Sequence, residues 1–387
     1  MPRPLRAEVF DPKEVCIVHC VQRCVRRAFL TGFDKESGKD YQYRREWIRE
    51  RMEKLASVFG IDCLTYAILS NHLHVVLRSR PDVVAAWTDK QVALRWLQIF
   101  PGKRIDDQLG DPTTVDVETL ANDKDRLADI RVRLSDISWY MRALCEPIAR
   151  IANKEDQCTG SFWEGRFKPT RILDEASLLA CCMYVELNPI RAAMAESLED
   201  SHFTSVFDRI GGMKGKKIAS SAVSMRALSR EEAIKLAKNT TPKQRALLRK
   251  EARKHKGPSI LRDAWLSPLT LNERGAVGPA VSKSGLRPSD KGFLSISQED
   301  YLALLDWTGR DGKPGKQGKV PEELAPVLQR LGIEGSMWSE LVWHYKRYFG
   351  KSPSAGKPDR MKDHASKHAK AFSPGQKLAK KCFFSQR

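Results

Sequence analysis

The sequence predicts an α+β protein in which helices pack on one antiparallel sheet. Three observations support this class: an apolar β-branched segment near the start, two short apolar segments joined by Ser70-Asn71, and apolar residues at helical spacing between and after them. The predicted order is strand, helix, strand, strand, helix, helix, strand, helix. Such an order fits an α+β sandwich with helices packed on one antiparallel sheet.

The first predicted elements occupy residues 15–80. Residues 15–22, VCIVHCVQ, are rich in β-branched types and predict a strand, and the basic residues 23–27 that follow should turn over the surface. Residues 40–58 alternate charges with apolar side chains at helical spacing, which predicts an amphipathic helix covering one sheet face. Residues 61–69 and 72–80 should then form two closely linked strands.

Residues 89–172 contain the next predicted elements. We expect helices at 89–100 and 132–152, separated by an irregular insertion at 101–125. Residues 160–172 alternate aromatic and polar side chains, as a strand does. Pro169 indicates an edge position for that strand, because proline has no amide hydrogen to donate.

A further helix should begin after Asp174, which is a suitable N-cap, and Glu175 is favourable in its first turn. It should end near Asn188, because Pro189 disfavours helical geometry in the residue before it.

The chain divides by composition into four parts. Residues 1–207 form the main predicted domain, and residues 208–228, which include GGMKGKK, form a flexible linker. Residues 229–350 predict a small helical accessory domain. Residues 351–387 are strongly basic with few large apolar side chains, which predicts a disordered cationic tail.

The charge of the chain indicates its partner. Its 387 residues include 67 Lys and Arg against 48 Asp and Glu, a formal charge of +19 that attracts polyanions such as nucleic acid. The alternative is a soluble basic protein without such a partner. No apolar segment approaches the roughly 20 residues that span a bilayer, and no secretory signal is evident at the start. We expect a cytoplasmic, nucleoid-associated protein with no membrane contact.

The nine cysteines lie mostly in apolar segments and lack the CxxC pairs of zinc sites. We expect reduced, buried thiols.

Two histidines in a predicted strand form the most distinctive motif. His72 and His74 are two positions apart, so both imidazoles face one side of the strand. Two neutral imidazoles so close together can bind a divalent cation, with water or substrate oxygen completing the shell. The alternative is a pair of hydrogen-bonded strand histidines without a metal.

A tyrosine on the last predicted helix is the candidate nucleophile. Tyr184 and Asn188 are four positions apart and so project from one helix face. A phenol of reference pKa about 10 attacks phosphorus only with help, which a metal on the phosphate can supply. The Asn188 side-chain oxygen can join the histidines as a third ligand, a set that favours Mg²⁺ or Mn²⁺ over structural zinc. The alternative for Tyr184 is ordinary core packing.

Together these segments resemble the single-tyrosine HUH transposases, in the branch associated with repetitive extragenic palindromes. His72-Leu73-His74 resembles the family's histidine motif, and residues 184–191, YVELNPIR, are similar to its tyrosine segment. Residues 160–167 and 18–27 resemble its preceding strand and its first strand. The resemblance covers roughly residues 10–207, so the insertion at 101–125 and everything beyond residue 210 inherit nothing from it.

The resemblance implies a ferredoxin-like antiparallel sheet with Tyr184 facing the histidines. It implies a metal-dependent endonuclease and strand transferase that cuts single-stranded DNA at hairpins through a 5′-phosphotyrosine, with the cation held by His72, His74 and Asn188. The phosphotyrosine conserves the energy of the phosphodiester, so rejoining needs no ATP. Family members include monomers and homodimers, and both stay open here.

Candidate DNA contacts follow the same segments. Cationic side chains are expected on phosphates, and two aromatic rings are expected to stack on an unpaired base. These residues are Arg23, Arg26, Arg27, Arg166, Lys168, Arg191, Phe162 and Trp163. Two alternatives remain: a module that binds single-stranded nucleic acid without cutting it, and a metal-dependent nuclease whose nucleophile is water.

Overall fold

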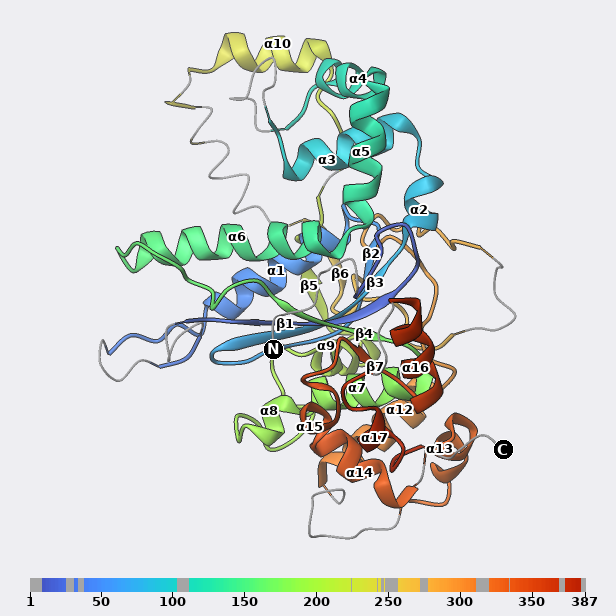
Figure 1. Ribbon diagram of the computed structural model, residues 1–387. Helices are drawn as coiled ribbons and strands as arrows, with labels where there is room; N and C mark the ends of the chain where they lie inside the picture. Colours follow the sequence, from blue (N-terminus) through green and yellow to red (C-terminus); the bar gives the residue numbers. More distant parts are fainter. Residues whose placement is uncertain are drawn as a thin grey trace.

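The chain forms a mixed α+β fold around a central sheet (Figure 1). The computed structural model describes residues 9–25, 31–33, 38–102, 111–223, 225–241, 243–244, 247, 257–271, 278–310, 320–333, 335–368 and 373–383. Arg26 and Arg27, two of the predicted DNA contacts, lie outside these described residues. No helix in the described part combines the length and apolar content needed to cross a membrane.

The central sheet has five strands in the order β2-β3-β1-β4-β7. All neighbours are antiparallel except β4 and β7, which are parallel. The strands are β1 (Ile17–Arg23), β2 (Ile61–Ile68), β3 (His72–Ser79), β4 (Lys168–Ile172) and β7 (Ser354–Ala355). A separate antiparallel pair joins β5 (Lys217–Ala219) to β6 (Ser259–Leu261).

Helices cover both faces of this sheet. In Figure 1, α1 (Arg44–Ala56) and α6 (Ile137–Glu155) lie above the sheet and α7 (Glu175–Glu186) lies below it. The remaining helices are α2 (Pro81–Ala85), α3 (Asp89–Ile99), α4 (Thr114–Asn122), α5 (Lys124–Ser135), α8 (Asn188–Arg191), α9 (Ser205–Met213), α10 (Arg230–Asn239), α12 (Gln298–Arg310), α13 (Ala325–Leu331), α14 (Gly335–Trp343), α15 (Tyr345–Phe349), α16 (Pro358–Lys367) and α17 (Gln376–Ala379).

The sheet separates two apolar cores because successive strand residues point to opposite faces. Cys20 of β1 and Val75 of β3 belong to the core beneath α1 and α6. Val76 of β3 belongs to the second core, with α7 and the C-terminal helices. All nine cysteines are free thiols and most are buried, as the sequence predicts.

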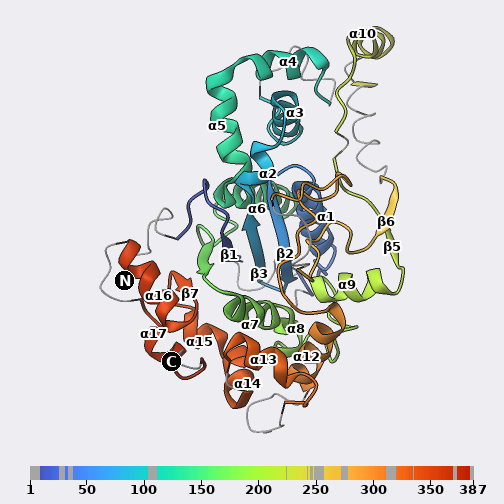
Figure 2. The ribbon, with the colours of Figure 1, turned by 90° about the vertical axis from the view of Figure 1, so that its right-hand side faces the viewer.

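Helix α7 matches its prediction closely. The Asp174 side chain accepts a hydrogen bond from the Ser177 amide at 2.8 Å, which caps the helix as expected. The helix ends at Glu186, and Pro189 lies in the short helix α8 that follows. From Ala176 to Glu186 every residue of α7 is buried, because the C-terminal helices cover its outer side (Figure 2).

Three predicted elements differ from the structure. The insertion at 101–125, predicted to be irregular, contains helix α4. A capping box formed by Thr113 and Asp116 stabilises the start of this helix. The helix expected at 132–152 is divided between α5 and α6, because Asp136 caps a new helix. The strand expected at 160–172 is reduced to β4, since Gly165 at φ 138° interrupts extended backbone before it.

The edge position predicted from Pro169 is partly correct. Strand β4 lies between β1 and β7, but β7 pairs only with Arg171 and Ile172. Pro169 therefore needs no amide donor on its outer side.

The predicted linker contains regular structure. Gly211 and Gly212 lie in α9, where a Cβ on Gly212 would come within 2.0 Å of the Asp263 carboxylate. These glycines allow close packing of two chain segments, whereas the sequence alone suggests flexibility.

The C-terminal half is not organised as predicted. Within 229–350, α10 has no buried residue and lies beside α4, far from α12 to α15, which pack below the sheet (Figures 1 and 2). The tail expected to be disordered forms β7, α16 and α17. Met361 and Ala379 of this tail are buried in the second core, and such anchors are hard to recognise in a mostly basic segment.

Candidate active site

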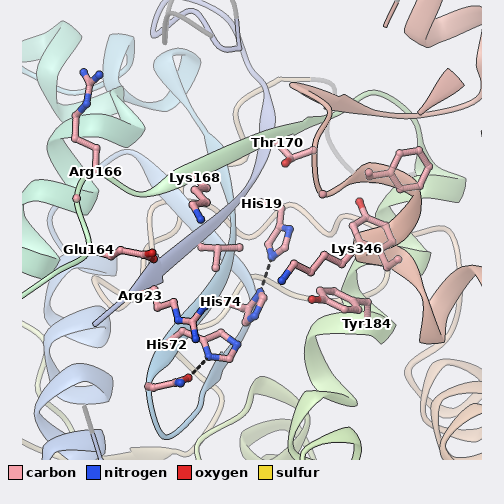
Figure 3. Close-up of a pocket in the computed structure, with 16 residues that line it drawn as sticks. His19, Arg23, His72, His74, Glu164, Arg166, Lys168, Thr170, Tyr184 and Lys346 are labelled. Atoms are coloured by element: carbon pink, nitrogen blue, oxygen red, sulfur yellow. Dashed lines mark hydrogen bonds between the residues drawn. The ribbon is translucent and has the colours of Figure 1, made fainter. Parts of the chain in front are cut away.

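Strand register places four of the predicted site residues on one sheet face. Arg23 of β1 pairs with His72 of β3, and Val21 of β1 lies between His74 of β3 and Lys168 of β4. Directly paired residues project to the same face of a sheet. Arg23, His72, His74 and Lys168 therefore share the face that α7 covers, as Figure 3 shows.

A third histidine, which the sequence analysis did not single out, joins the pair. His19 of β1 lies on the same face, and its Nε2 is 2.9 Å from His74 Nδ1. The two rings stack with centroids 5.1 Å apart and an interplanar angle of 13°. His72 Nδ1 contacts the Asn71 side-chain oxygen at 2.6 Å, and the His72 and His74 ring centroids are 4.9 Å apart.

The three imidazoles are neutral in this environment. Burial lowers the pKa of His19 to about 4 and the pKa of His72 to about 4. The pKa of His74 is also lowered, mainly by burial and further by the other two histidines. Neutral imidazoles retain a nitrogen lone pair, which metal binding requires. His74 Nε2 is buried and has no hydrogen-bond partner among the described residues.

Helix α7 brings Tyr184 to this cluster. The Tyr184 ring centroid lies 5.6 Å from that of His74 and 6.1 Å from that of His19. The side chain is only 6% exposed, and this burial raises the pKa of its hydroxyl. Arg191 opposes this rise in the Tyr184 pKa. Its guanidinium carbon lies 4.8 Å from the Tyr184 ring centroid, and its positive charge favours the phenolate. Arg191, predicted as a phosphate contact, thus lies against the candidate nucleophile.

Asn188 lies against Tyr184, and its side chain helps to lower the pKa of the Tyr184 hydroxyl. Its Nδ2 donates to the Tyr184 backbone carbonyl at 2.9 Å, and the residue is buried. Asn188 is not among the residues that line the cavity between Tyr184 and the histidines. Within the described residues, no group of three or more His, Cys, Asp and Glu side chains could hold a metal ion.

A cavity of about 300 Å³ lies between the sheet and α7. Four cationic side chains line it against a single carboxylate, so its charge favours an anionic ligand. They are Arg23, Arg166, Lys168 and Lys346, with Glu164 as the carboxylate. In the described structure Arg23, Lys168 and Lys346 form no side-chain ion pair that would neutralise them.

The two aromatic residues predicted to stack on bases lie elsewhere. Phe162 is 2% exposed and Trp163 is 9% exposed, and both belong to the core beneath α6. Trp163 Nε1 donates to the Cys145 carbonyl at 2.9 Å, which fixes the ring inside the protein. Both side chains also line a second cavity of about 690 Å³ beneath α6, separate from the cavity between the sheet and α7.

Helix α15 completes the cavity with Tyr345, Lys346 and Phe349, for which the sequence offers no signal. Tyr345 stacks on Tyr184 with centroids 5.1 Å apart and an interplanar angle of 24°, and Lys346 lines the cavity beside it. His19 did have a signal, since it alternates with Ile17 and Val21 in the first predicted strand.

Known proteins resemble this chain too weakly to identify its family. No protein-family model and no curated protein matches the chain. Among solved structures, the chain is similar to a REP-associated tyrosine transposase bound to a REP hairpin, with a TM-score of 0.33 and 13% identity. The alignment covers 56% of this chain and 87% of that chain. This TM-score is too low to establish a common fold.

Proposed function

We propose that the chain is a metal-dependent enzyme that nicks and rejoins single-stranded DNA at hairpins, with Tyr184 as the nucleophile. The observation that carries the proposal is the position of the Tyr184 phenol. It faces the paired strand histidines across a cationic cavity, with its ring centroid 5.6 Å from that of His74. A tyrosine packed only for stability needs a hydrogen-bond partner for its hydroxyl, but it does not need a cationic cavity lined by histidines.

Two of the three proposed ligands fit a Mg²⁺ or Mn²⁺ ion. His72 and His74 each use Nδ1 for a contact with the protein, so Nε2 of each ring is left for the ion, and His74 Nε2 is buried without a partner. Asn188, the proposed third ligand, does not line the cavity in this conformation. A cation bound here would therefore rely on phosphate oxygens for negative charge, as Mg²⁺ commonly does.

The chemistry proposed for the site is transesterification. The bound cation would polarise a non-bridging oxygen of the scissile phosphate. Tyr184 Oη forms a bond to phosphorus while the bond to the DNA 3′ oxygen breaks. The leaving 3′ oxygen takes a proton from solvent, so the products are a 5′-phosphotyrosine and a free 3′-hydroxyl. The phenol proton passes to solvent, and Arg191 stabilises the phenolate before attack. A 3′-hydroxyl that attacks the phosphotyrosine reverses the step and joins the strands.

The cationic lining supports DNA as the substrate. Arg23 and Lys168 approach the histidines from adjacent strands, whereas Arg166 lies at the cavity edge with its guanidinium directed away from the histidines (Figure 3). Phosphate contacts of this kind position a strand without selecting its sequence. We therefore propose that these three residues orient the phosphates beside the scissile bond. We propose that the strands β1 to β4 correspond to the ferredoxin-like sheet of the family described above.

The direct test is the covalent adduct. We expect a 3′-labelled single-stranded hairpin oligonucleotide, drawn from a hairpin library and incubated with Mn²⁺, to give a labelled protein band on a denaturing gel. Tyr184→Phe should reduce this band to background while DNA binding is retained, because only the nucleophile is lost. Tyr43→Phe, an exposed tyrosine outside the cavity, is the control and should leave the band unchanged.

The other outcomes separate the alternatives. Cleavage that persists in Tyr184→Phe without an adduct would indicate water as the nucleophile. Binding without cleavage in the native protein would indicate a non-catalytic nucleic-acid module. His72→Ala should abolish both the Mn²⁺ dependence and the cleavage.

A further inference from the structure

The C-terminal extension contributes one wall of the candidate active site. Tyr345, Lys346, Phe349 and Gly350 all line the cavity, although they follow Tyr184 by more than 150 residues in the chain. The resemblance described above ends near residue 207, so nothing inherited from it assigns these residues a role.

The extension is firmly attached to the sheet and to α7. Strand β7 pairs in parallel with β4, and the Leu173 amide donates to the Ala355 carbonyl at 2.9 Å. The Lys357 amide donates to the Asp174 carboxylate at 2.6 Å, on the residue that caps α7. Tyr345 is 2% exposed and stacks on Tyr184. Helix α15 is thus held in one position relative to the candidate nucleophile.

From helix α15, the Lys346 side chain extends its ammonium toward the histidines and Tyr184 (Figure 3). Its charge lowers the pKa values of both His72 and His74, which places it within electrostatic range of both rings. Among the described residues, no side chain or carbonyl forms a hydrogen bond or ion pair with this ammonium. The next residue, Arg347, instead points to Glu340 at 3.7 Å on the surface.

We propose that Lys346 is a catalytic residue whose ammonium binds a non-bridging oxygen of the phosphodiester that Tyr184 attacks. The inference rests on the proposed function. Attack on phosphorus adds negative charge to the equatorial oxygens, and a fixed cation stabilises that charge more than it stabilises the ground state. Lys346 lines the cavity together with Tyr184 and His74, so its ammonium can supply positive charge at this point.

The test compares Lys346→Met with Arg347→Met, which removes the neighbouring charge on the same helix. We expect Lys346→Met to slow single-turnover adduct formation by about 10²-fold, the typical effect of removing one transition-state donor. Oligonucleotide affinity, measured by fluorescence anisotropy, should fall by less than about tenfold, because other cations hold the strand. Lys346→Arg should recover part of the rate, and Arg347→Met should match the native protein.

A native rate in Lys346→Met, or equal losses in both variants, overturns the proposal. A second measurement separates it from the function on which it rests. Titration calorimetry with inorganic phosphate should show binding to the native protein and to Tyr184→Phe, and binding at least about fivefold weaker to Lys346→Met. If the native protein forms no adduct but this pattern holds, the transesterase function fails while the anion-binding role of Lys346 stands. Unchanged phosphate binding in Lys346→Met overturns that role in either case.

Discussion

His19 determines which nitrogen of His74 faces the cavity. The contact between His19 Nε2 and His74 Nδ1, at 2.9 Å, requires one donor and one acceptor. If His74 Nδ1 carries the proton, His74 Nε2 keeps its lone pair, and this nitrogen has no hydrogen-bond partner among the described residues, so it can bind a cation. Metal-binding histidines are commonly held in this way by a partner on the other ring nitrogen. We therefore assign His19 a positioning role.

This role predicts a specific defect in His19→Ala. The variant should need roughly 10- to 100-fold more Mn²⁺ for half-maximal adduct formation, as is typical when a ligand's hydrogen-bond partner is lost. DNA binding should be unchanged, and His19→Gln should restore part of the metal affinity because its side-chain oxygen can accept the same bond. The Mn²⁺ dependence of the adduct rate measures this. His202→Ala, an exposed histidine outside the cavity, serves as the control, and an unshifted Mn²⁺ curve for His19→Ala would refute the role.

At the scale of elements, a buried carboxylate holds the nucleophile helix in place. Glu186, near the end of α7, accepts hydrogen bonds from Ser205 of α9 and Tyr301 of α12. Burial raises the pKa of this carboxyl, and the hydrogen bonds from Ser205 and Tyr301 act in the opposite direction. The contacts connect three helices that are far apart in the sequence, so the position of Tyr184 depends on all three.

The raised pKa of Glu186 makes its contribution to stability depend on pH. Because the folded pKa lies above the unfolded one, the neutral form favours folding at low pH, and this contribution is lost as pH rises through the folded pKa. Glu186→Gln stays neutral, so its free energy of unfolding relative to the native protein should increase from pH 4.5 to pH 8. Urea unfolding at several pH values measures the difference. A difference independent of pH would show that Glu186 does not titrate differently on folding.

At the scale of the whole molecule, the C-terminal helices and the predicted nuclease region share one core. Leu341 of α14 is fully buried in the same cluster as Leu179 and Val185 of α7. An independent accessory domain would have a core of its own. Helices α12 to α15 instead form an outer layer that encloses α7 between themselves and the sheet. They also bury Tyr184.

Because the two helices share a core, a substitution that destabilises α14 should also destabilise α7. Leu341→Ala should lower the free energy of unfolding by about 2–5 kcal/mol, since it creates a buried cavity. Hydrogen–deuterium exchange should accelerate in α7 as well as in α14. Ile234→Ala, on the exposed face of α10, should change stability by less than about 0.5 kcal/mol. Faster exchange confined to α14 would instead support a separate accessory domain.

The sequence by itself determined the parts of the site that follow local rules. Strand alternation places His72 and His74 on one face, and the Asp174 cap with Pro189 defines the helix that carries Tyr184. These features depend on residues within a few positions of each other. The approximate limits of β1 to β3 and of α1 follow in the same way from apolar periodicity.

Only the tertiary structure decided which distant segments meet at that site. The contact of His19 with His74, the burial of Phe162, and the approach of Lys346 each join residues that no local pattern relates. Sheet order and helix docking depend on how the whole chain buries its apolar surface. The basic, weakly apolar tail can therefore supply strand β7, and the segment just before it can supply a wall of the cavity, because the rest of the protein provides the surfaces on which they pack.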